Sequence, residues 1–274
     1  MPVAHEVVTD PHDPRVRGYV GLTDAQLRAG IERDDPVFVV EGHTALGRAA
    51  RSTYRLRSVL CLPGRLDAVA AALAGTTASD VPVYVAERSV VAATAGFDVH
   101  RGVLALAERG TPRRADDVAA AARTLVILEG LSDQENLGAI ARSARALGVD
   151  GLLLDPTSAD PLGRRAVRVS MGELLQLPWA RVPAWPAGLG SLADAGWRVW
   201  ALTPAADATP MRAMGRRDGE RVAILLGAEG PGLTAAAMAH AERVRIPIER
   251  GVDSLNVGHA AAIACWHATG SDPA

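Results

Sequence analysis

Three short polar stretches interrupt the apolar second half of the chain. They read LSDQENLGAIAR, GAEGPGLT and VDSLNVGH, and each of them follows an apolar run. Amide, hydroxyl, carboxylate and guanidinium groups can bind phosphate, orient a hydroxyl group and stabilise developing charge. Among the side chains of these stretches that could do such chemistry are Asn136, Arg142, Glu229, Ser254 and Asn256.

Each polar stretch also has a simpler structural explanation. Asn136 could cap the helix that follows it, with Arg142 on the solvated face of that helix. Ser254 or Asn256 could cap the last helix, although one cap does not account for a loop that is polar throughout. For each loop taken alone, both explanations stay open.

The second stretch contains three glycines, Gly227, Gly230 and Gly232. Glycine lets the backbone take positive φ or approach a ligand closely. The spacing Gly-x-x-Gly-x-Gly differs from the dinucleotide-binding Gly-x-Gly-x-x-Gly, and no ribose-binding acid follows about 20 residues later. Such a turn alone is typical of a tight loop rather than of a particular ligand.

Apolar strands alternate with helical patterns in two runs along the chain. The first run has expected strands at 37–42, 58–63, 81–86 and 102–107, with helices at 43–52, 65–74 and 87–96. The second run has expected strands at 124–130, 151–155, 179–183, 197–203, 221–227 and 243–248, with helices at about 137–147, 163–176, 187–195, 233–241 and 257–268.

This alternation predicts an α/β fold with a parallel sheet covered on both faces in the second run. Ligands bind such sheets outside the carboxyl ends of the strands, where the polar stretches lie. The segment 108–123 is polar, charged and Ala-rich, which favours a domain boundary. We therefore expect a smaller N-terminal α/β domain at 1–113, a linker at 114–123 and a second domain at 124–274.

The composition excludes several classes of protein. Apolar residues make up 49% of the chain and charged residues 22%, which is typical of a globular protein, and no apolar run is long enough to span a membrane. The start of the chain lacks the pattern of a secretory signal, and Cys61 and Cys265 form no disulfide framework or metal motif, so we expect a cytoplasmic protein.

All 29 basic residues are arginine, and the formal net charge is −2. Without lysine there is no Walker-type phosphate loop, no pyridoxal Schiff base and no kinase-type lysine. Arginine remains the only cation for phosphate, which its planar fork binds well.

The combination of the three stretches is more specific than any one of them. Asn-x5-Arg after a strand, then Gly-Ala-Glu-Gly-x-Gly, then Ile-Pro-Ile…Ser-Leu-Asn-Val before an Ala-rich helix resembles the SpoU (TrmH) family of RNA ribose 2′-O-methyltransferases. The resemblance covers residues 124–269, and the first domain is similar, more loosely, to a ribosomal-protein-like substrate-binding domain. It implies a SPOUT domain with a deep trefoil knot, a homodimer formed through this C-terminal domain, and S-adenosylmethionine as cofactor.

The resemblance also assigns roles to residues. Methyl transfer to a ribose hydroxyl requires a cofactor pocket, a held hydroxyl and a proton acceptor. The family's catalytic positions fall on the five side chains named above. Arg142 would clamp the phosphate and stabilise the alkoxide, because a guanidinium stays protonated. Glu229 would orient Arg142 or its loop. The implied cofactor-binding residues are Leu226, Gly227, Glu229, Gly230, Ile246, Leu255 and Asn256.

RNA is the expected partner despite the negative net charge, because phosphate binding depends on local potential. Arginines cluster around Tyr54, which could stack on an unpaired base, although an ordinary solvated helix and turn would look similar. The expected RNA-binding residues are Arg48, Arg51, Tyr54, Arg55, Arg57 and Arg145. We expect no metal site, because His267 and Cys265 are too few ligands.

Some alternatives remain open. His259 could face solvent or reach the site as a proton acceptor, and His100 raises a similar question. A Rossmann-type enzyme would place its glycine-rich loop after the first strand of its sheet, where the sequence has none. A catalytically silent RNA-binding protein could use the same scaffold. Ribosomal RNA is favoured over transfer RNA as the target, because of the additional N-terminal domain.

Overall fold

The computed structural model describes residues 3–270, without the side chains at 25, 26, 29 and 32, and divides the chain into two compact units. Unit 1 comprises Met1–Thr111 together with Leu162–Gln176, and unit 2 comprises Pro112–Pro161 and Leu177–Ala274. The chain therefore passes between the units three times. None of the described helices is long and apolar enough to cross a membrane.

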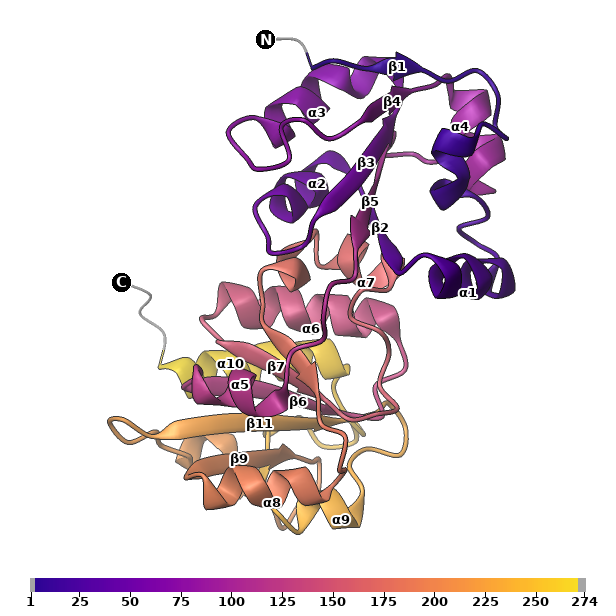
Figure 1. Ribbon diagram of the computed structural model, residues 1–274. Coiled ribbons are helices and arrows are strands. Elements are labelled where there is room, and N and C mark those ends of the chain that lie inside the picture. Colours follow the sequence, from indigo (N-terminus) through magenta and orange to yellow (C-terminus); the bar gives the residue numbers. More distant parts are fainter. Residues whose placement is uncertain (1–2, 271–274) are drawn as a thin grey trace. The chain divides into compact units, whose positions relative to one another are not determined.

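Unit 1 is built on a mixed five-stranded sheet of order β1-β4-β3-β5-β2 (Figure 1). β1 and β3 both run parallel to β4, whereas β5 is antiparallel to β3 and to β2. The strands are β1 (Glu6–Val7), β2 (Val37–Glu41), β3 (Leu56–Cys61), β4 (Val83–Val85) and β5 (Val103–Glu108), and the helices are η1 (Pro14–Tyr19), α1 (Ala25–Asp34), α2 (His43–Ala50), η2 (Pro63–Arg65), α3 (Leu66–Leu73) and α4 (Arg88–Ala95).

The segment 162–176 packs onto unit 1, although it lies far along the chain. It carries α7 (Arg164–Val169) and η3 (Glu173–Leu175). Arg164 forms a 2.5 Å ion pair with the buried carboxylate of Glu41, and its guanidinium lies 4.7 Å from the centre of the Phe97 ring. The expected helix at 163–176 is therefore two short helices, and it belongs to the N-terminal unit.

Unit 2 contains a seven-stranded sheet of order β10-β12-β9-β11-β6-β7-β8, in which every strand pair is parallel. The predicted parallel sheet is thus confirmed. The strands are β6 (Thr124–Glu129), β7 (Gly151–Leu154), β8 (Trp179–Arg181), β9 (Trp197–Leu202), β10 (Thr209–Pro210), β11 (Arg221–Gly227) and β12 (Glu242–Arg245).

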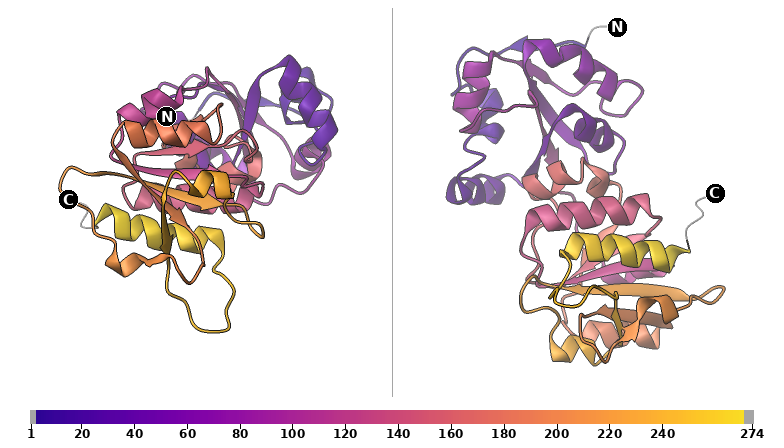
Figure 2. Two further views of the ribbon diagram at one scale, coloured as in Figure 1. Left: turned by 90° about the horizontal axis from the view of Figure 1, so that it is seen from below. Right: turned by 180° about the vertical axis from the view of Figure 1, so that it is seen from behind.

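Helices cover both faces of the unit 2 sheet (Figures 1 and 2). On β6, Leu125 and Ile127 belong to a core shared with α5, α8 and α9, so the alternate positions point to the face where α6 and α10 pack. This burial on two sides explains the continuous apolar strands. The helices are α5 (Ala115–Ala120), α6 (Gln134–Ala146), α8 (Ala187–Asp194), η4 (Met211–Ala213), α9 (Ala235–Met238) and α10 (Val257–Thr269).

The expected linker at 114–123 has a different structure. Most of it forms α5, and Val118, Ala119 and Ala122 are buried in the core of unit 2. Its exposed side is charged, which makes the sequence resemble a linker, whereas its Ala and Val residues cover β7 and β8. Unit 2 therefore begins with this helix rather than at Thr124.

Candidate functional site

The three polar stretches of the sequence meet at the carboxyl ends of β6 and β11. The Nδ2 of Asn136, on α6, donates a 2.8 Å hydrogen bond to Oε1 of Glu229, which follows β11. The Nδ2 of Asn256, just before α10, donates to Oδ1 of Asn136 at 3.0 Å and to Oε1 of Glu229 at 3.1 Å. We call these three residues the amide–carboxylate triangle. Each vertex comes from a different polar stretch.

Asn136 is free for this role because another residue caps its helix. Asp133 is the N-cap of α6, and its carboxylate accepts a 2.7 Å hydrogen bond from the backbone N–H of Glu135. The possibility that Asn136 opens the helix is therefore wrong. Asn136 lies within the first turn of α6, and its amide points across to the glycine-rich loop.

Asn256 performs both functions that the sequence left open. Its Oδ1 accepts hydrogen bonds from the backbone N–H of Gly258 at 2.9 Å and of His259 at 3.4 Å, which caps α10. Its Nδ2 serves the triangle at the same time. A side-chain amide carries an acceptor and a donor at one end, so one residue can be both cap and site residue.

The glycines after β11 are required by the backbone. A Cβ at Gly227 would lie 2.3 Å from the carbonyl carbon of Gly232, and Gly230 and Gly232 have φ of 88° and 70°. The N–H of Gly232 donates to the carbonyl of Ala228 at 3.0 Å, which folds the loop back on itself. The expected positive φ is found at Gly230 and Gly232, Gly227 packs against the backbone of its own loop, and the tight turn is one wall of a pocket.

That pocket has a volume of about 550 Å³, which is within the usual range for a small-molecule site. Backbone of the glycine-rich loop forms one wall, and apolar side chains from the ends of β9, β12 and α10 form the others. All seven residues expected to bind the cofactor line it, namely Leu226, Gly227, Glu229, Gly230, Ile246, Leu255 and Asn256, and Ser254 lines it too. Ile246, Ser254, Leu255 and Asn256 belong to the long loop 246–256, which precedes α10 (Figure 2).

This lining fits an adenosine-containing group. Ile246 and Leu255 offer apolar contacts for the faces of a flat base, while backbone amides and carbonyls of a loop without Cβ atoms can approach its edges. Apolar walls with a few placed polar groups are typical of cofactor sites. The residues present therefore fit S-adenosylmethionine.

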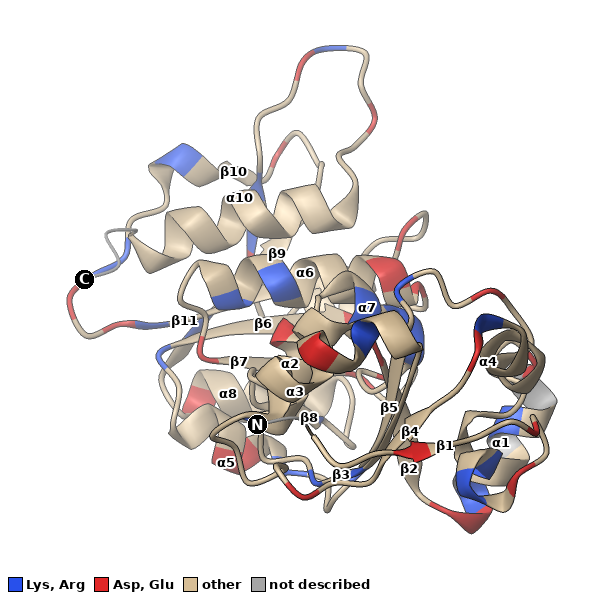
Figure 3. Cartoon of the chain, turned by 90° about the horizontal axis from the view of Figure 1, so that it is seen from above, with Lys and Arg blue, Asp and Glu red and all other residues tan. Residues whose placement is uncertain are grey.

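Arg142 lies on α6 and is exposed. Among residues 3–270 its guanidinium has no hydrogen bond or ion pair, and it does not line the pocket. Glu229 contacts the two asparagines, whereas the sequence predicts that it orients Arg142 or its own loop. Arg142 and the exposed Arg145 leave a basic face on α6 that is free to meet an anion (Figure 3).

Sequence reasoning missed Glu129, the last residue of β6. It is only 6% exposed, and its carboxylate accepts three hydrogen bonds from Thr234 and Trp185. The available signal was an acidic residue at the end of an otherwise apolar strand. A buried carboxylate requires such partners, so its position predicts contacts that the local sequence does not reveal.

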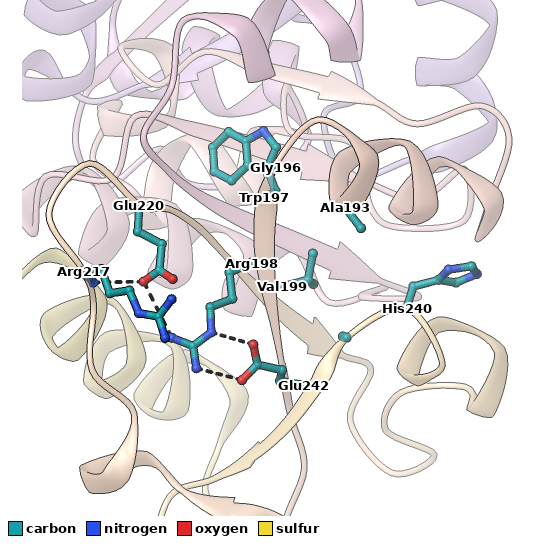
Figure 4. Close-up of a pocket in the computed structure, with 10 residues that line it drawn as sticks. Ala193, Gly196, Trp197, Arg198, Val199, Arg217, Glu220, His240 and Glu242 are labelled. Atoms are coloured by element: carbon teal, nitrogen blue, oxygen red, sulfur yellow. Dashed lines mark hydrogen bonds and ion pairs between the residues drawn. The ribbon is translucent and has the colours of Figure 1, made fainter.

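A second depression in unit 2 lies on another part of the sheet (Figure 4). Its central charged groups are paired with one another: Arg198 donates to both carboxylate oxygens of Glu242 at 2.5 and 2.8 Å and lies 3.6 Å from Glu220. None of the residues expected to do chemistry lines this depression. It is therefore a structural ion-pair network.

The arginines expected to bind RNA in unit 1 differ in their surroundings. Arg48 donates to the carbonyl of Met171 at 2.6 Å and forms a 2.7 Å ion pair with Glu173. Arg57 forms a 2.8 Å ion pair with Asp35. Acids elsewhere in unit 1 neutralise these two arginines, so they are less available to bind phosphate.

The other members of that cluster are more accessible. Arg51 is exposed and donates to backbone carbonyls, and the side chain of Arg55 is 80% exposed although it lies 3.3 Å from Glu108. Tyr54 is half-buried, with its ring edge-on to Phe38 at 5.2 Å. Arg51 and Arg55 are therefore the members best placed to meet phosphate.

The histidines singled out in the sequence lie apart from the triangle. His259 is exposed, and only its backbone N–H contacts Asn256. His267 bonds through Nε2 with the carbonyl of Met214, and the side chain of His100 is 87% exposed. No group of three His, Cys, Asp or Glu side chains within the described part of the chain could hold a metal ion.

Comparison with known proteins gives the same family as the motifs. The SpoU rRNA Methylase family matches residues 123–266. An uncharacterised tRNA/rRNA methyltransferase of Mycobacterium tuberculosis H37Rv is 42% identical over 266 residues, which are 96% of this chain and 91% of that protein. The 23S rRNA (guanosine-2′-O-)-methyltransferase RlmB of Escherichia coli K12 is 28% identical over 82% of this chain and 95% of its own length.

Solved structures agree. The AdoMet-bound rRNA methyltransferase from Sinorhizobium meliloti has a TM-score of 0.77 and 25% identity, and the match covers 96% of each chain. A structure of an RNA 2′-O ribose methyltransferase has a TM-score of 0.74 and 26% identity over 96% of this chain and 97% of its own. The predicted cofactor, S-adenosylmethionine, is confirmed by this group of proteins. The chain belongs to the SpoU rRNA methylase family.

Proposed function

We propose that the protein methylates a ribose 2′-hydroxyl of ribosomal RNA. The observation that carries this proposal is the amide–carboxylate triangle, which closes one side of the pocket and adjoins the exposed Arg142 helix. The ribose and ribosomal specificity is that of the similar E. coli enzyme, and the 28% identity supports it without fixing the nucleotide.

The chain's own residues would share the work as follows. S-adenosylmethionine supplies an activated methyl group on a sulfonium, and the loop 227–233 with Ile246 and Leu255 would hold its adenosine part. Arg142, with a permanent charge, would bind the phosphate beside the target ribose and lower the energy of the developing alkoxide. Asn136, Glu229 and Asn256 fix each other, so that the loops around the reacting groups keep one arrangement. The hydroxyl proton would leave to water or to a phosphate oxygen of the substrate.

The proposal is tested by mapping 2′-O-methyl groups in RNA from cells with and without the protein. A methylated 2′-oxygen cannot attack the neighbouring phosphate, so alkaline cleavage is lost at that nucleotide. We expect one or a few protected positions in 23S rRNA that disappear when the gene is removed. Methyl groups found only on bases, or only in transfer RNA, would contradict the proposal.

A catalytically silent RNA-binding protein is the second candidate. The intact triangle and the formed pocket favour an enzyme, because a protein that only covers RNA needs neither. Transfer of tritium from labelled S-adenosylmethionine to total RNA distinguishes the two. Binding of RNA with no transfer above background would favour the silent protein.

We further propose a cytoplasmic homodimer formed through unit 2, whose chain would thread the trefoil knot of its family. On α10, Ile263 and Trp266 are 42% and 56% exposed, which is unusual for large apolar side chains. A second copy would cover them. Light scattering should give twice the chain mass at micromolar concentration, and Trp266→Arg should shift it to the monomer. A monomeric wild-type protein would refute the dimer.

A further inference from the structure

Glu129 holds both ends of the glycine-rich loop. Its main chain is the cross-strand neighbour of Gly227, where the loop leaves β11. Its side chain accepts hydrogen bonds from Thr234, where the loop ends: the backbone N–H donates to Oε2 at 2.8 Å and the hydroxyl to Oε1 at 2.8 Å. The loop 228–233 therefore begins and ends on one residue of the adjacent strand.

The third partner of this carboxylate lies outside the loop. The Nε1 of Trp185 donates to Oε1 of Glu129 at 2.7 Å. Trp185 precedes α8 and packs against the core of unit 2. The carboxylate thus connects the loop to the body of the unit, and its near-complete burial protects these hydrogen bonds from water.

Thr234 connects Glu129 to the helix that follows the loop. Its hydroxyl also accepts a 3.1 Å hydrogen bond from the N–H of Ala237, which caps α9. The hydroxyl proton is therefore directed to Glu129 and its lone pair to the helix. One threonine fixes the point where the loop turns into α9, and Glu129 fixes the threonine.

We propose that Glu129 is a positioning residue for the cofactor, acting through the loop 228–233. It does not line the pocket, yet Glu229 and Gly230, which do, lie on the loop that it holds. A loop fixed before the cofactor binds loses less conformational freedom on binding, which increases affinity. This inference rests on the proposed assignment of the pocket to S-adenosylmethionine.

The chemistry requires a carboxylate at this position. The N–H of Thr234 and the Nε1 of Trp185 can only donate, so each needs an acceptor. Glutamine has the same shape but presents an NH₂ group on one side, which would face a donor. Glu129→Gln therefore breaks at least one of the three hydrogen bonds without creating a cavity.

The experiment compares four full-length proteins by calorimetric titration with S-adenosylmethionine. Glu129→Gln should weaken affinity about tenfold, which is the loss expected for a buried hydrogen bond to a charged group. The matched control, Trp185→Phe, removes the third hydrogen bond of the same carboxylate and should lower the melting temperature while affinity stays within about twofold. Leu255→Ala, an exposed pocket residue, reports on the pocket itself and should also weaken binding.

Kinetics supply a second measurement. In Glu129→Gln the KM for S-adenosylmethionine should rise while the KM for RNA stays at the wild-type value, which a general loss of stability would not produce. If Glu129→Gln does not fold, the pair Thr234→Val and Thr234→Ser replaces it. The valine lacks the hydroxyl and should weaken affinity, and the serine should restore it.

The outcomes separate the two proposals. Weak binding by Leu255→Ala with normal binding by Glu129→Gln would overturn the positioning role and leave the pocket assignment intact. Equal losses of affinity in Glu129→Gln and Trp185→Phe would reduce Glu129 to a stabilising residue of the core. Normal binding by Leu255→Ala would remove the pocket assignment, and the inference about Glu129 with it.

Discussion

Asn256 and Asn136 are joined by a 3.0 Å hydrogen bond across 120 residues of sequence, and the same Asn256 amide group caps the last helix. The side chain that caps the start of α10 therefore also donates a hydrogen bond to Asn136 on α6. The formation of the helix and the formation of the site depend on one side chain.

Asn256→Asp should separate these two functions. The carboxylate still accepts from the N–H groups of α10, so the helix stays capped. It loses the donor and brings negative charge to Glu229, about 3 Å away, so methyl transfer should fall more than about tenfold. Circular dichroism checks the helix and tritium transfer checks the reaction. Wild-type activity in the aspartate variant would show that the donor is unnecessary.

Arg142→Ala should abolish methyl transfer and leave S-adenosylmethionine affinity within about twofold of wild type. The reason is its position: the side chain is exposed on α6 and absent from the pocket lining. Calorimetry and single-turnover kinetics on the same preparation measure both properties. Arg145→Ala, one turn further along α6, should weaken RNA affinity, as expected of an RNA-binding residue, but should retain most of the rate at saturating RNA. A collapse of cofactor affinity in Arg142→Ala would place Arg142 in the pocket instead.

Asp155 should make the stability of unit 2 depend on acidity. Its burial opposes ionisation, but hydrogen bonds from Ser158, Thr157 and the backbone outweigh this and hold the pKa of its carboxyl below the ordinary 3.8. The stabilisation is therefore complete above that value and is lost as the pH falls through the pKa of the folded protein.

The variant Asp155→Asn tests this dependence. It should be less stable than wild type by about 1–3 kcal/mol at pH 7, and the difference should shrink below pH 4. Urea titrations at several pH values measure it, with the exposed Asp218→Asn as a control that shows no such trend. A difference that stays constant with pH would mean that the charge of Asp155 is irrelevant.

Arg51→Ala with Arg55→Ala should reduce the salt dependence of RNA affinity, by roughly one unit of slope for each phosphate that the variant no longer binds. Both side chains are exposed, whereas Arg48 and Arg57 are held by Glu173 and Asp35. Titrations over one salt series check the slope, with Arg33→Ala as the exposed control on unit 1. An unchanged slope would remove these arginines from the RNA surface.

The sequence predicted the alternation of strands and helices, because that alternation depends on local patterns, whereas the residues that line the pocket were implied by the resemblance of three short motifs to a known family. Continuous apolar strands and the order of three short motifs contain that information without reference to distant contacts. Even the double role of Asn256 could be anticipated, since one cap could not account for the whole loop.

What the sequence could not show depends on long-range partners. Arg48 lies in a stretch with few acids, but Glu173, which is 125 residues further along the chain, forms an ion pair with it in the folded protein. The same segment, 162–176, has the helical pattern of unit 2 and the packing of unit 1. Removing residues 1–113 would therefore leave its apolar side chains uncovered, so an N-terminal deletion is a poor test of RNA binding.

Because the segment 162–176 belongs to unit 1, it also affects the order in which the two units can fold during synthesis. Synthesis proceeds from the N-terminus, so residues 3–111 leave the ribosome while Glu41 still lacks Arg164, its buried counter-ion. The first strands and α6 of unit 2 are translated before that partner arrives. The N-terminal unit thus completes its fold only after translation has entered the second one, and any natural exchange of this unit between relatives must transfer two separate stretches of gene.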